Sequence, residues 1–205
     1  QKAMASKEEF AALTDGLHGH CGFDLGKRID LSGTAAVFEL PDGRYAFKMQ
    51  GFMPENGADR HEKTDRVPYK SWAEAGYCTL TPGDVTDNSY VYNWICEGER
   101  EHGWEVEEVD YDGRNATDLA IRMNEDRNRE DFCVEVAQTC AGQNLAVKTF
   151  RELLLQDKVV LEESPLVLWC LQNAIEIQNN YGDIKLSKRH KDDTERIDPV
   201  AAAMN

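Results

Sequence analysis

Residues 34–52 constrain the fold of this chain most. They read TAAVFELPDGRYAFKMQGF, and Asp42-Gly43 separates two runs rich in Val, Phe, Tyr and Met. An Asp-Gly pair between two such runs is a strong β-hairpin signal, because Gly readily adopts the positive φ that a tight turn needs. The short apolar run HCGFDLG precedes this hairpin. We therefore expect three antiparallel strands, the first of which ends near Asp24.

Helix and strand patterns then alternate along the chain. The apolar spacing predicts helices over 89–102, 115–127 and 144–158, and strands over 104–112, 132–138 and 158–161. In the third helix we expect four side chains to face the core: Leu145, Phe150, Leu153 and Leu154. A helix opened by Ser164-Pro165, a hairpin around Tyr181-Gly182 and a last short helix follow.

This order predicts an α/β fold with a mixed sheet, in which three antiparallel strands precede parallel strands and helices cover both faces. If the strand at 104–112 lies parallel beside the first strand, their carboxyl ends meet at one edge. Open sheets of this kind bind ligands at such an edge. Asp24 ends the first strand and Asp112 ends the fourth, so we expect both carboxylates there.

Length and composition favour one main domain. The chain has 205 residues, 41% of them hydrophobic, which is enough for a sizeable core. Gly16 and Gly19 break the short helix-like pattern of residues 4–14, and we interpret residues 1–17 as a linker remnant before a domain at 18–205. The polar residues 53–88 predict an insertion with a short helix near 71–75 and a strand near 77–80.

Cysteine usage and hydropathy exclude several classes of protein. The six cysteines form no C-x-x-C pair, so neither a zinc site nor a disulfide framework is indicated. There is no apolar run of membrane-spanning length and no leader pattern, so we expect neither a membrane partner nor secretion.

A formal net charge of -15 argues, taken alone, against nucleic acid as a partner, since phosphate binding normally leaves a basic footprint. Two local basic runs partly answer that objection. The first consists of Lys185, Lys188, Arg189, Lys191 and Arg196, and the second of Arg60, His61, Lys63 and Arg66. We expect Lys188, Arg189, Lys191 and Arg196 to contact DNA, although charge runs are more often solvated faces.

Asp24 and Asp30 bracket a tight connection between the first two strands, so both carboxylates point toward one site. Carboxylates held so close repel, and one of them takes up a proton unless a cation lies between them. Oxygen ligands suit Mg²⁺ or Mn²⁺, and two such ions can hydrolyse a phosphodiester.

Several segments resemble the C-terminal nuclease domain of the large terminase subunit of tailed bacteriophages. They are GFDLGKRIDLSG, DRVPYKSW with GYCTLTPGDV, VDYDGRNAT and TERIDPVAA, and they occur in the family's order from Gly22 to the chain's last residues. The resemblance implies a ribonuclease H-like fold and a two-metal endonuclease that cuts concatemeric double-stranded phage DNA. It places the catalytic and metal-binding carboxylates at Asp24, Asp112 and Asp198, with Asp30 as a further candidate ligand.

The resemblance also implies partners and a setting. These are the ATPase domain of the same polypeptide, the small terminase subunit and the portal protein, in the cytoplasm of the infected bacterial host. No G-x-x-x-x-G-K-[ST] motif occurs, so the ATPase half is absent from this chain. Two details depart from the family pattern, namely Gly26 after Asp24-Leu25 and Gly113-Arg114 after Asp112, and neither removes a carboxylate.

Alternatives stay open at two of these positions. Asp198 precedes Pro199, a pair that also begins helices, and Asp110 is a second candidate ligand because it faces the same side of its strand as Asp112. His190 is a minor candidate for proton transfer. At the level of function, the alternatives are another ribonuclease H-like nuclease, of resolvase or transposase type, and a non-catalytic docking module of the packaging motor.

Overall fold

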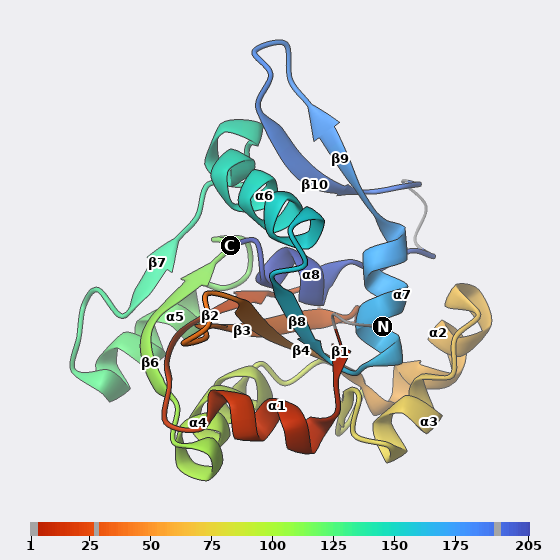
Figure 1. The fold of residues 1–205 in the computed structure, drawn as a ribbon. Helices are drawn as coiled ribbons and strands as arrows, with labels where there is room; N and C mark the ends of the chain where they lie inside the picture. The colour runs from red at the N-terminus through yellow and green to blue at the C-terminus, as the bar shows by residue number, and fades with distance from the viewer. Residues whose placement is uncertain (1–3, 27–28, 191–193) are drawn as a thin grey trace.

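The computed structural model describes residues 4–26, 29–190 and 194–205, which form a mixed sheet with helices on both faces (Figure 1). Within these residues the main sheet has the strand order β1-β8-β4-β3-β2-β6-β7, and β5 pairs with β4. Its strands are β1 (Met4–Ala5), β2 (His18–Asp24), β3 (Ser32–Glu39), β4 (Tyr45–Pro54), β5 (Thr79–Thr81), β6 (Glu105–Tyr111), β7 (Cys133–Glu135) and β8 (Val159–Glu162). A separate hairpin consists of β9 (Ala174–Gln178) and β10 (Ile184–Lys188).

The predicted sheet order is confirmed. Strands β2, β3 and β4 are antiparallel, and Gly43 turns the chain between β3 and β4 with a φ of 78°. Strand β6 then lies parallel beside β2, with Tyr111 opposite Phe23, and β7 continues in parallel. The carboxyl ends of β2 and β6 therefore meet at one edge.

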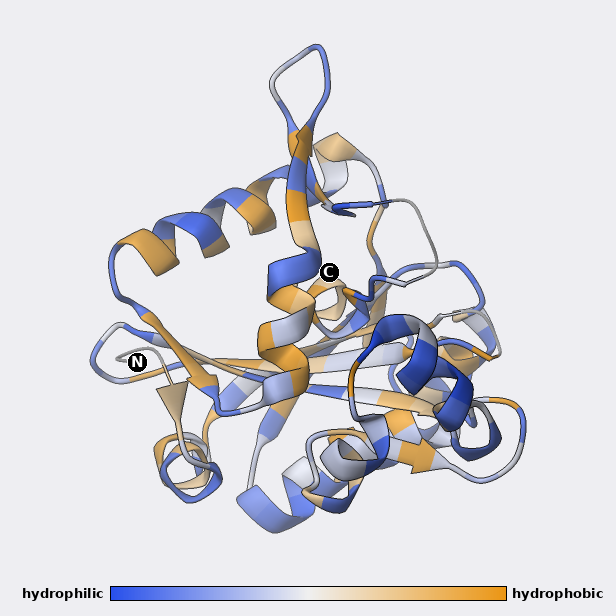
Figure 2. Cartoon of the chain, turned by 90° about the vertical axis from the view of Figure 1, so that its right-hand side faces the viewer, coloured by the Kyte–Doolittle hydropathy of each residue, from blue (hydrophilic) through white to orange (hydrophobic). Residues whose placement is uncertain are grey.

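The helices form two layers, one on each face of the sheet. On one face α1, α4 and α5 pack with β2, β3 and β6, and on the other α6, α7 and α8 pack with β3, β4 and β8 (Figure 1). The helices are α1 (Lys7–Thr14), α2 (Ala58–Asp65), α3 (Tyr69–Glu74), α4 (Ser89–His102), α5 (Thr117–Arg127), α6 (Cys140–Leu155), α7 (Pro165–Asn173) and α8 (Asp198–Ala202), with a 3-10 turn, η1 (Glu55–Gly57), before α2. Hydrophobic residues concentrate in the central sheet and hydrophilic ones in the outer helices and loops (Figure 2). No helix in the described part of the chain is long and apolar enough to cross a membrane.

The N-terminal segment differs from the predicted linker. Strand β1 pairs in parallel with β8 at the sheet edge, and Ser6 caps α1 by accepting a hydrogen bond from the backbone N–H of Glu9. Phe10 of α1 is only 1% exposed within the core under the sheet. Residues 4–14 therefore contribute to the sheet and the core, because burying the Phe10 ring stabilises their docking.

The 53–88 segment contains the predicted helix and strand, as α3 and β5, and one further helix, α2. The sequence of α2 is ADRHEKTD, which has no apolar stripe, so its pattern does not predict a helix. Its buried residues are instead Ala58, His61 and Asp65. Polar contacts of His61 and Asp65, together with the burial of the small Ala58 side chain, therefore hold this helix on the domain.

Two glycines let α8 lie directly against the sheet. A Cβ at Gly22 would lie 2.1 Å from the carbonyl oxygen of Ala202, and a Cβ at Gly33 would lie 2.3 Å from the backbone carbon of Asp198. Any side chain at either position would push α8 away. Gly33 of β3 thus lets the start of α8 lie on the strand end that carries Asp24, and Gly22 of β2 lets its last residue lie against the sheet.

Candidate active site

Two of the predicted carboxylates lie on neighbouring strands. Asp24 is the last residue of β2, and Asp112 directly follows β6. Since Phe23 is opposite Tyr111 in the parallel register, Asp24 and Asp112 leave the sheet side by side. Paired strands lie about 4.8 Å apart, so the sheet itself sets the spacing of these two residues.

Asp198 reaches the same place from the other layer. It is the first residue of α8, whose backbone contacts Gly33, and Gly33 is the partner of Asp24 in the β2–β3 ladder. The structure therefore brings together residues 24, 112 and 198, although more than 80 residues of sequence separate each from the next along the chain.

The carboxyl groups influence one another's pKa values. Burial raises the pKa of Asp24 to about 8, and the negative charges of Asp198 and Asp112 add to that rise. Burial also raises the pKa of Asp198 to about 6, against the opposing effect of the Lys188 ammonium. Both shifts have the cause expected for carboxylates in a shared, poorly solvated site. The group behaves as one electrostatic cluster, which we call the carboxylate cluster: Asp24, Asp30, Asp112 and Asp198.

One oxygen of this cluster is suited to a cation. Oδ2 of Asp198 is buried and has no hydrogen-bond partner among the described residues. Asp198 makes no side-chain cap for α8, whose N-cap residue is Ile197, so the capping alternative does not account for this oxygen. A buried carboxylate oxygen without a donor is costly, and a metal ion is one of the few partners that relieves the cost. The residues present therefore fit a divalent cation with oxygen ligands.

Asp30 lies at the border of the cluster and is already bound. Its Oδ1 accepts a hydrogen bond from the backbone N–H of Leu31 at 2.9 Å and forms an ion pair with Arg196. Asp30 contributes negative charge to Asp24 and Asp198, as their raised pKa values reflect. The structure thus brings Asp30 into the cluster with a cationic partner of its own.

The basic residues predicted to bind DNA fall into different surroundings. Lys188 is the last residue of β10, and its positive charge opposes the rise in the pKa of Asp24 and Asp198. Arg189 is exposed and donates a hydrogen bond to the carbonyl oxygen of Gln172. Arg196 differs from the prediction, because it is 2% exposed and paired with acids, which leaves it no surface for a DNA phosphate. Lys191 lies outside the described residues. His190 is exposed and contacts Glu195.

A second set of possible ligands has no signal in the sequence pattern. This set consists of His20 of β2 and of Glu108 and Asp110 of β6, each of which has one possible ligand atom within 4.8 Å of the other two. Among the described residues, no other three His, Cys, Asp or Glu side chains lie so close together. A register shift between Gly19 and His20 brings His20 opposite Glu108. Asp110, the alternative ligand, therefore belongs to this set, and the carboxylate cluster is more widely spaced.

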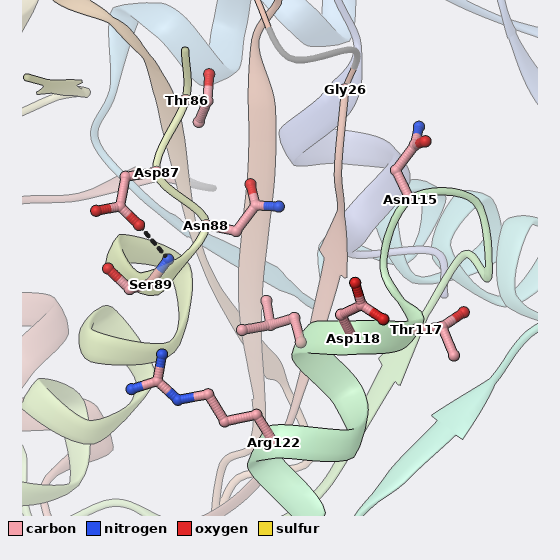
Figure 3. Close-up of a pocket in the computed structure, with 10 residues that line it drawn as sticks. Gly26, Thr86, Asp87, Asn88, Ser89, Asn115, Thr117, Asp118 and Arg122 are labelled. Carbon is pink, nitrogen blue, oxygen red and sulfur yellow. Dashed lines mark hydrogen bonds between the residues drawn. The ribbon is translucent and has the colours of Figure 1, made fainter. Parts of the chain in front are cut away.

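A polar cleft of about 790 Å³ adjoins the carboxylate cluster. It lies between the beginnings of α4 and α5. Two of its lining residues are close in sequence to the cluster, since Gly26 follows Asp24 by two residues and Asn115 follows Asp112 by three. Ser89 N–H donates to Asp87 Oδ1 at 2.9 Å on one wall, and Arg122 extends from α5 on the other (Figure 3). The residues lining it are Gly26, Thr86, Asp87, Asn88, Ser89, Asn115, Thr117, Asp118, Leu119 and Arg122. No sequence pattern indicates this cleft, because its two walls come from separate helices.

Comparison with known proteins points to one family. Residues 12–205 match the family model of the terminase large subunit, endonuclease domain. The terminase large subunit of Enterobacteria phage HK97 is 28% identical over 191 residues, which cover 89% of this chain and 35% of that protein. The chain therefore spans about a third of the length of this relative.

Solved structures agree with that match. The crystal structure of the HK97 bacteriophage large terminase superposes with a TM-score of 0.81 and 27% identity, over 93% of this chain and 39% of the other. The large terminase nuclease from thermophilic phage G20c, solved with bound magnesium, has a TM-score of 0.53 and 15% identity, over 92% of this chain and 79% of the other, and shares the fold. By its sequence match over nearly its whole length, this chain belongs to the family of terminase large-subunit endonuclease domains.

Proposed function

We propose that this domain is a DNA endonuclease that hydrolyses phosphodiester bonds with two divalent cations, Mg²⁺ or Mn²⁺. The observation that carries the proposal is the buried Oδ2 of Asp198, which lies without a donor among the described residues in a cluster with Asp24. The magnesium bound to the nuclease of phage G20c, which has the same fold, supports this proposal.

The three catalytic residues have distinct roles in this mechanism. Asp24 is central, since Asp112 on the neighbouring strand and Asp198 on α8 both act on its carboxyl group, and these three residues would hold the cations. At neutral pH and without metal its carboxyl group carries a proton, because burial and the neighbouring acids raise its pKa to about 8. Asp112 and Asp198 complete the two sides of the site. Bound cations would activate the attacking water and stabilise the leaving oxygen.

We infer that duplex DNA approaches along the open edge of the sheet. Lys188 stands beside Asp24 and Asp198, where its ammonium can face a phosphate, and Arg189 and Lys191 follow it in the sequence. These three residues are the proposed DNA contacts. With a net charge of -15, the domain alone has low affinity for duplex DNA.

The larger protein supplies the rest of the packaging function in this proposal. An ATPase domain of the same polypeptide, the small terminase subunit and the portal protein hold the DNA, and the nuclease cuts concatemeric genomes in the cytoplasm of the infected bacterium. Proposed boundaries for the nuclease domain are residues 18–205 with the insertion at 53–88, to which the packed residues 4–14 are added.

Plasmid cleavage tests the proposal directly. Supercoiled plasmid should be nicked and linearised in Mn²⁺ or Mg²⁺ and left intact in EDTA, and Asp198→Asn should abolish cleavage with an unchanged circular dichroism spectrum. The matched control is Asp131→Asn, which changes an exposed acid two residues before the start of β7. This variant should cut like wild type. Absence of cleavage in wild type would favour a docking module, and preference for branched over linear duplex would favour a resolvase-like nuclease.

A further inference from the structure

Arg196 is buried where the 58–74 helices meet the carboxylate cluster. Its side chain is 3% exposed. The Nε atom donates a hydrogen bond to Oδ2 of Asp65 at 3.1 Å, and the Nη1 atom forms an ion pair with Oδ1 of Asp30. A guanidinium presents its N–H donors in a rigid plane and stays charged, so one arginine can hold two carboxylates at once. Arg196 therefore connects a buried acid of α2 to an acid of the cluster.

Asp65 fixes the guanidinium from the α2 side. The Asp65 side chain has no exposed surface. It accepts hydrogen bonds from the Tyr69 hydroxyl at 2.9 Å and from the Thr64 hydroxyl at 2.8 Å, in addition to that from Arg196. A buried charge is tolerated when it is paired and fully hydrogen-bonded, as this one is. The position of Arg196 is thus determined by a saturated acceptor.

His61 joins the same network from one turn earlier in α2. Its Nε2 lies 2.9 Å from the carbonyl oxygen of Ile29, and its Nδ1 lies 3.2 Å from Nη2 of Arg196. A carbonyl only accepts and a guanidinium only donates, which assigns the ring proton to Nε2 and leaves Nδ1 as the acceptor. His61 therefore holds the residue before Asp30 and Arg196 at a fixed separation.

We propose that Arg196 is a positioning residue for the metal site, a role that rests on the proposed endonuclease function. It holds the Asp30 carboxylate beside the cluster, and it fixes the backbone two residues before Asp198. Without it, Asp30 would turn away from Asp24 and Asp198, since like charges repel. The insertion that carries Asp65 and His61 is, through Arg196, a support of the metal site.

Mn²⁺ binding measured by calorimetry tests this role, with thermal unfolding in EDTA measured on the same samples. Arg196→Gln should weaken Mn²⁺ binding by about 10–100-fold, the loss typical of residues that orient metal ligands, and should lower Tm by leaving Asp65 buried and unpaired. The double variant Asp65→Asn/Arg196→Gln contains no unpaired buried charge. Its Tm in EDTA should recover relative to Arg196→Gln, whereas its Mn²⁺ affinity should stay low.

A control variant separates general destabilisation from positioning. Arg127→Gln breaks a partly buried ion pair with Glu99 between α4 and α5, so it should lower Tm without changing Mn²⁺ affinity. Recovery of Mn²⁺ affinity together with Tm in the double variant would show that Arg196 is only structural and would overturn the proposal. Wild-type affinity in both Arg196 variants would overturn it too. Failure of the wild-type domain itself to bind Mn²⁺ would instead refute the endonuclease proposal, and the role of Arg196 with it.

Discussion

Asp65 and Asp198 are both buried acids on the same side of the domain, yet their surroundings are opposite. Every donor that Asp65 needs comes from the protein, namely Tyr69, Thr64 and Arg196. Oδ2 of Asp198 has no such donor among the residues described. A fully hydrogen-bonded buried carboxylate is tolerated by the fold and is costly to break, whereas an unsatisfied one costs stability and calls for a functional explanation. In our proposals the Asp65–Arg196 network is therefore a support, and the carboxylate cluster is the site of the chemistry.

The largest expected effect is the loss of activity from the cluster without loss of fold. Asp24→Ala and Asp112→Ala should each reduce metal-dependent plasmid cleavage to the background level, because each removes an anionic ligand from the site. Circular dichroism of both variants should match wild type. Wild-type cutting rates in correctly folded variants would break the assignment.

The opposite result is expected at Asp65. Asp65→Ala should cost about 3–5 kcal/mol, because it removes one of the two acids that pair with the buried Arg196 guanidinium and also the acceptor of the Tyr69 hydroxyl. In a domain of this length each kcal/mol lowers Tm by about 2–4 °C, so calorimetry or circular dichroism melting will measure the change readily. The exposed Asp59, which pairs with Lys70, is the matched control, and Asp59→Ala should leave Tm nearly unchanged.

The pH dependence of stability sharpens the comparison further. In EDTA at about pH 5, the folded domain holds protons on Asp24 and Asp198, because their pKa values are raised to about 8 and about 6. The unfolded chain has already released these protons at that pH, since its aspartates have the ordinary, lower pKa. The folded state therefore binds more protons than the unfolded one, and this contribution to stability falls as pH rises from about 5 to about 8. Asp24→Asn should flatten the decline in Tm with pH.

Mn²⁺ should raise Tm most at the higher pH, where no proton competes for the carboxylates. The triple variant Asp24→Asn/Asp112→Asn/Asp198→Asn should lose that response to Mn²⁺.

The smallest expected effect concerns DNA binding. The domain should bind duplex DNA weakly, without sequence preference and with steep salt dependence. Replacing Lys188, Arg189 and Lys191 together by Ala should flatten the slope of log affinity against log salt, by about 0.9 for each phosphate that these side chains neutralise. Arg196 is excluded from this set because it is buried. Tight binding to one short sequence, unaffected by the triple substitution, would place the DNA track elsewhere.

Local patterns predict most helices and strands, because alternation and helical spacing are properties of short segments. They are less reliable about which residues face the core. Phe150 of α6 packs edge-on against Phe47, with ring centroids 5.2 Å apart, whereas Leu145 is 77% exposed and Leu154 is 41% exposed, which contradicts the prediction for these two residues. Helix α6 lies against the sheet along a narrower stripe than its leucines suggest.

The same limit applies to the polar residues. Asp24 and Asp112 can be placed from strand ends, since the parallel register follows from the order of the elements. The basic run around Arg196 predicts a solvated side chain, and nothing in a single run reveals a buried partner 131 residues away. Asp65 has no visible signal at all, because α2 is polar throughout.

The sequence by itself determined the mixed sheet, the turn at Gly43, the strand ends that carry Asp24 and Asp112, and the resemblance that included Asp198. These depend on neighbours within a few residues or on motifs in a fixed order. Only the tertiary structure decided which acids are saturated and which are not, because Arg196, the cationic partner that Asp65 and Asp30 share, is distant from both in sequence. Whether a buried carboxylate has enough hydrogen-bond donors depends on all the atoms around it. Those atoms come together only after the helix layers have packed on the sheet.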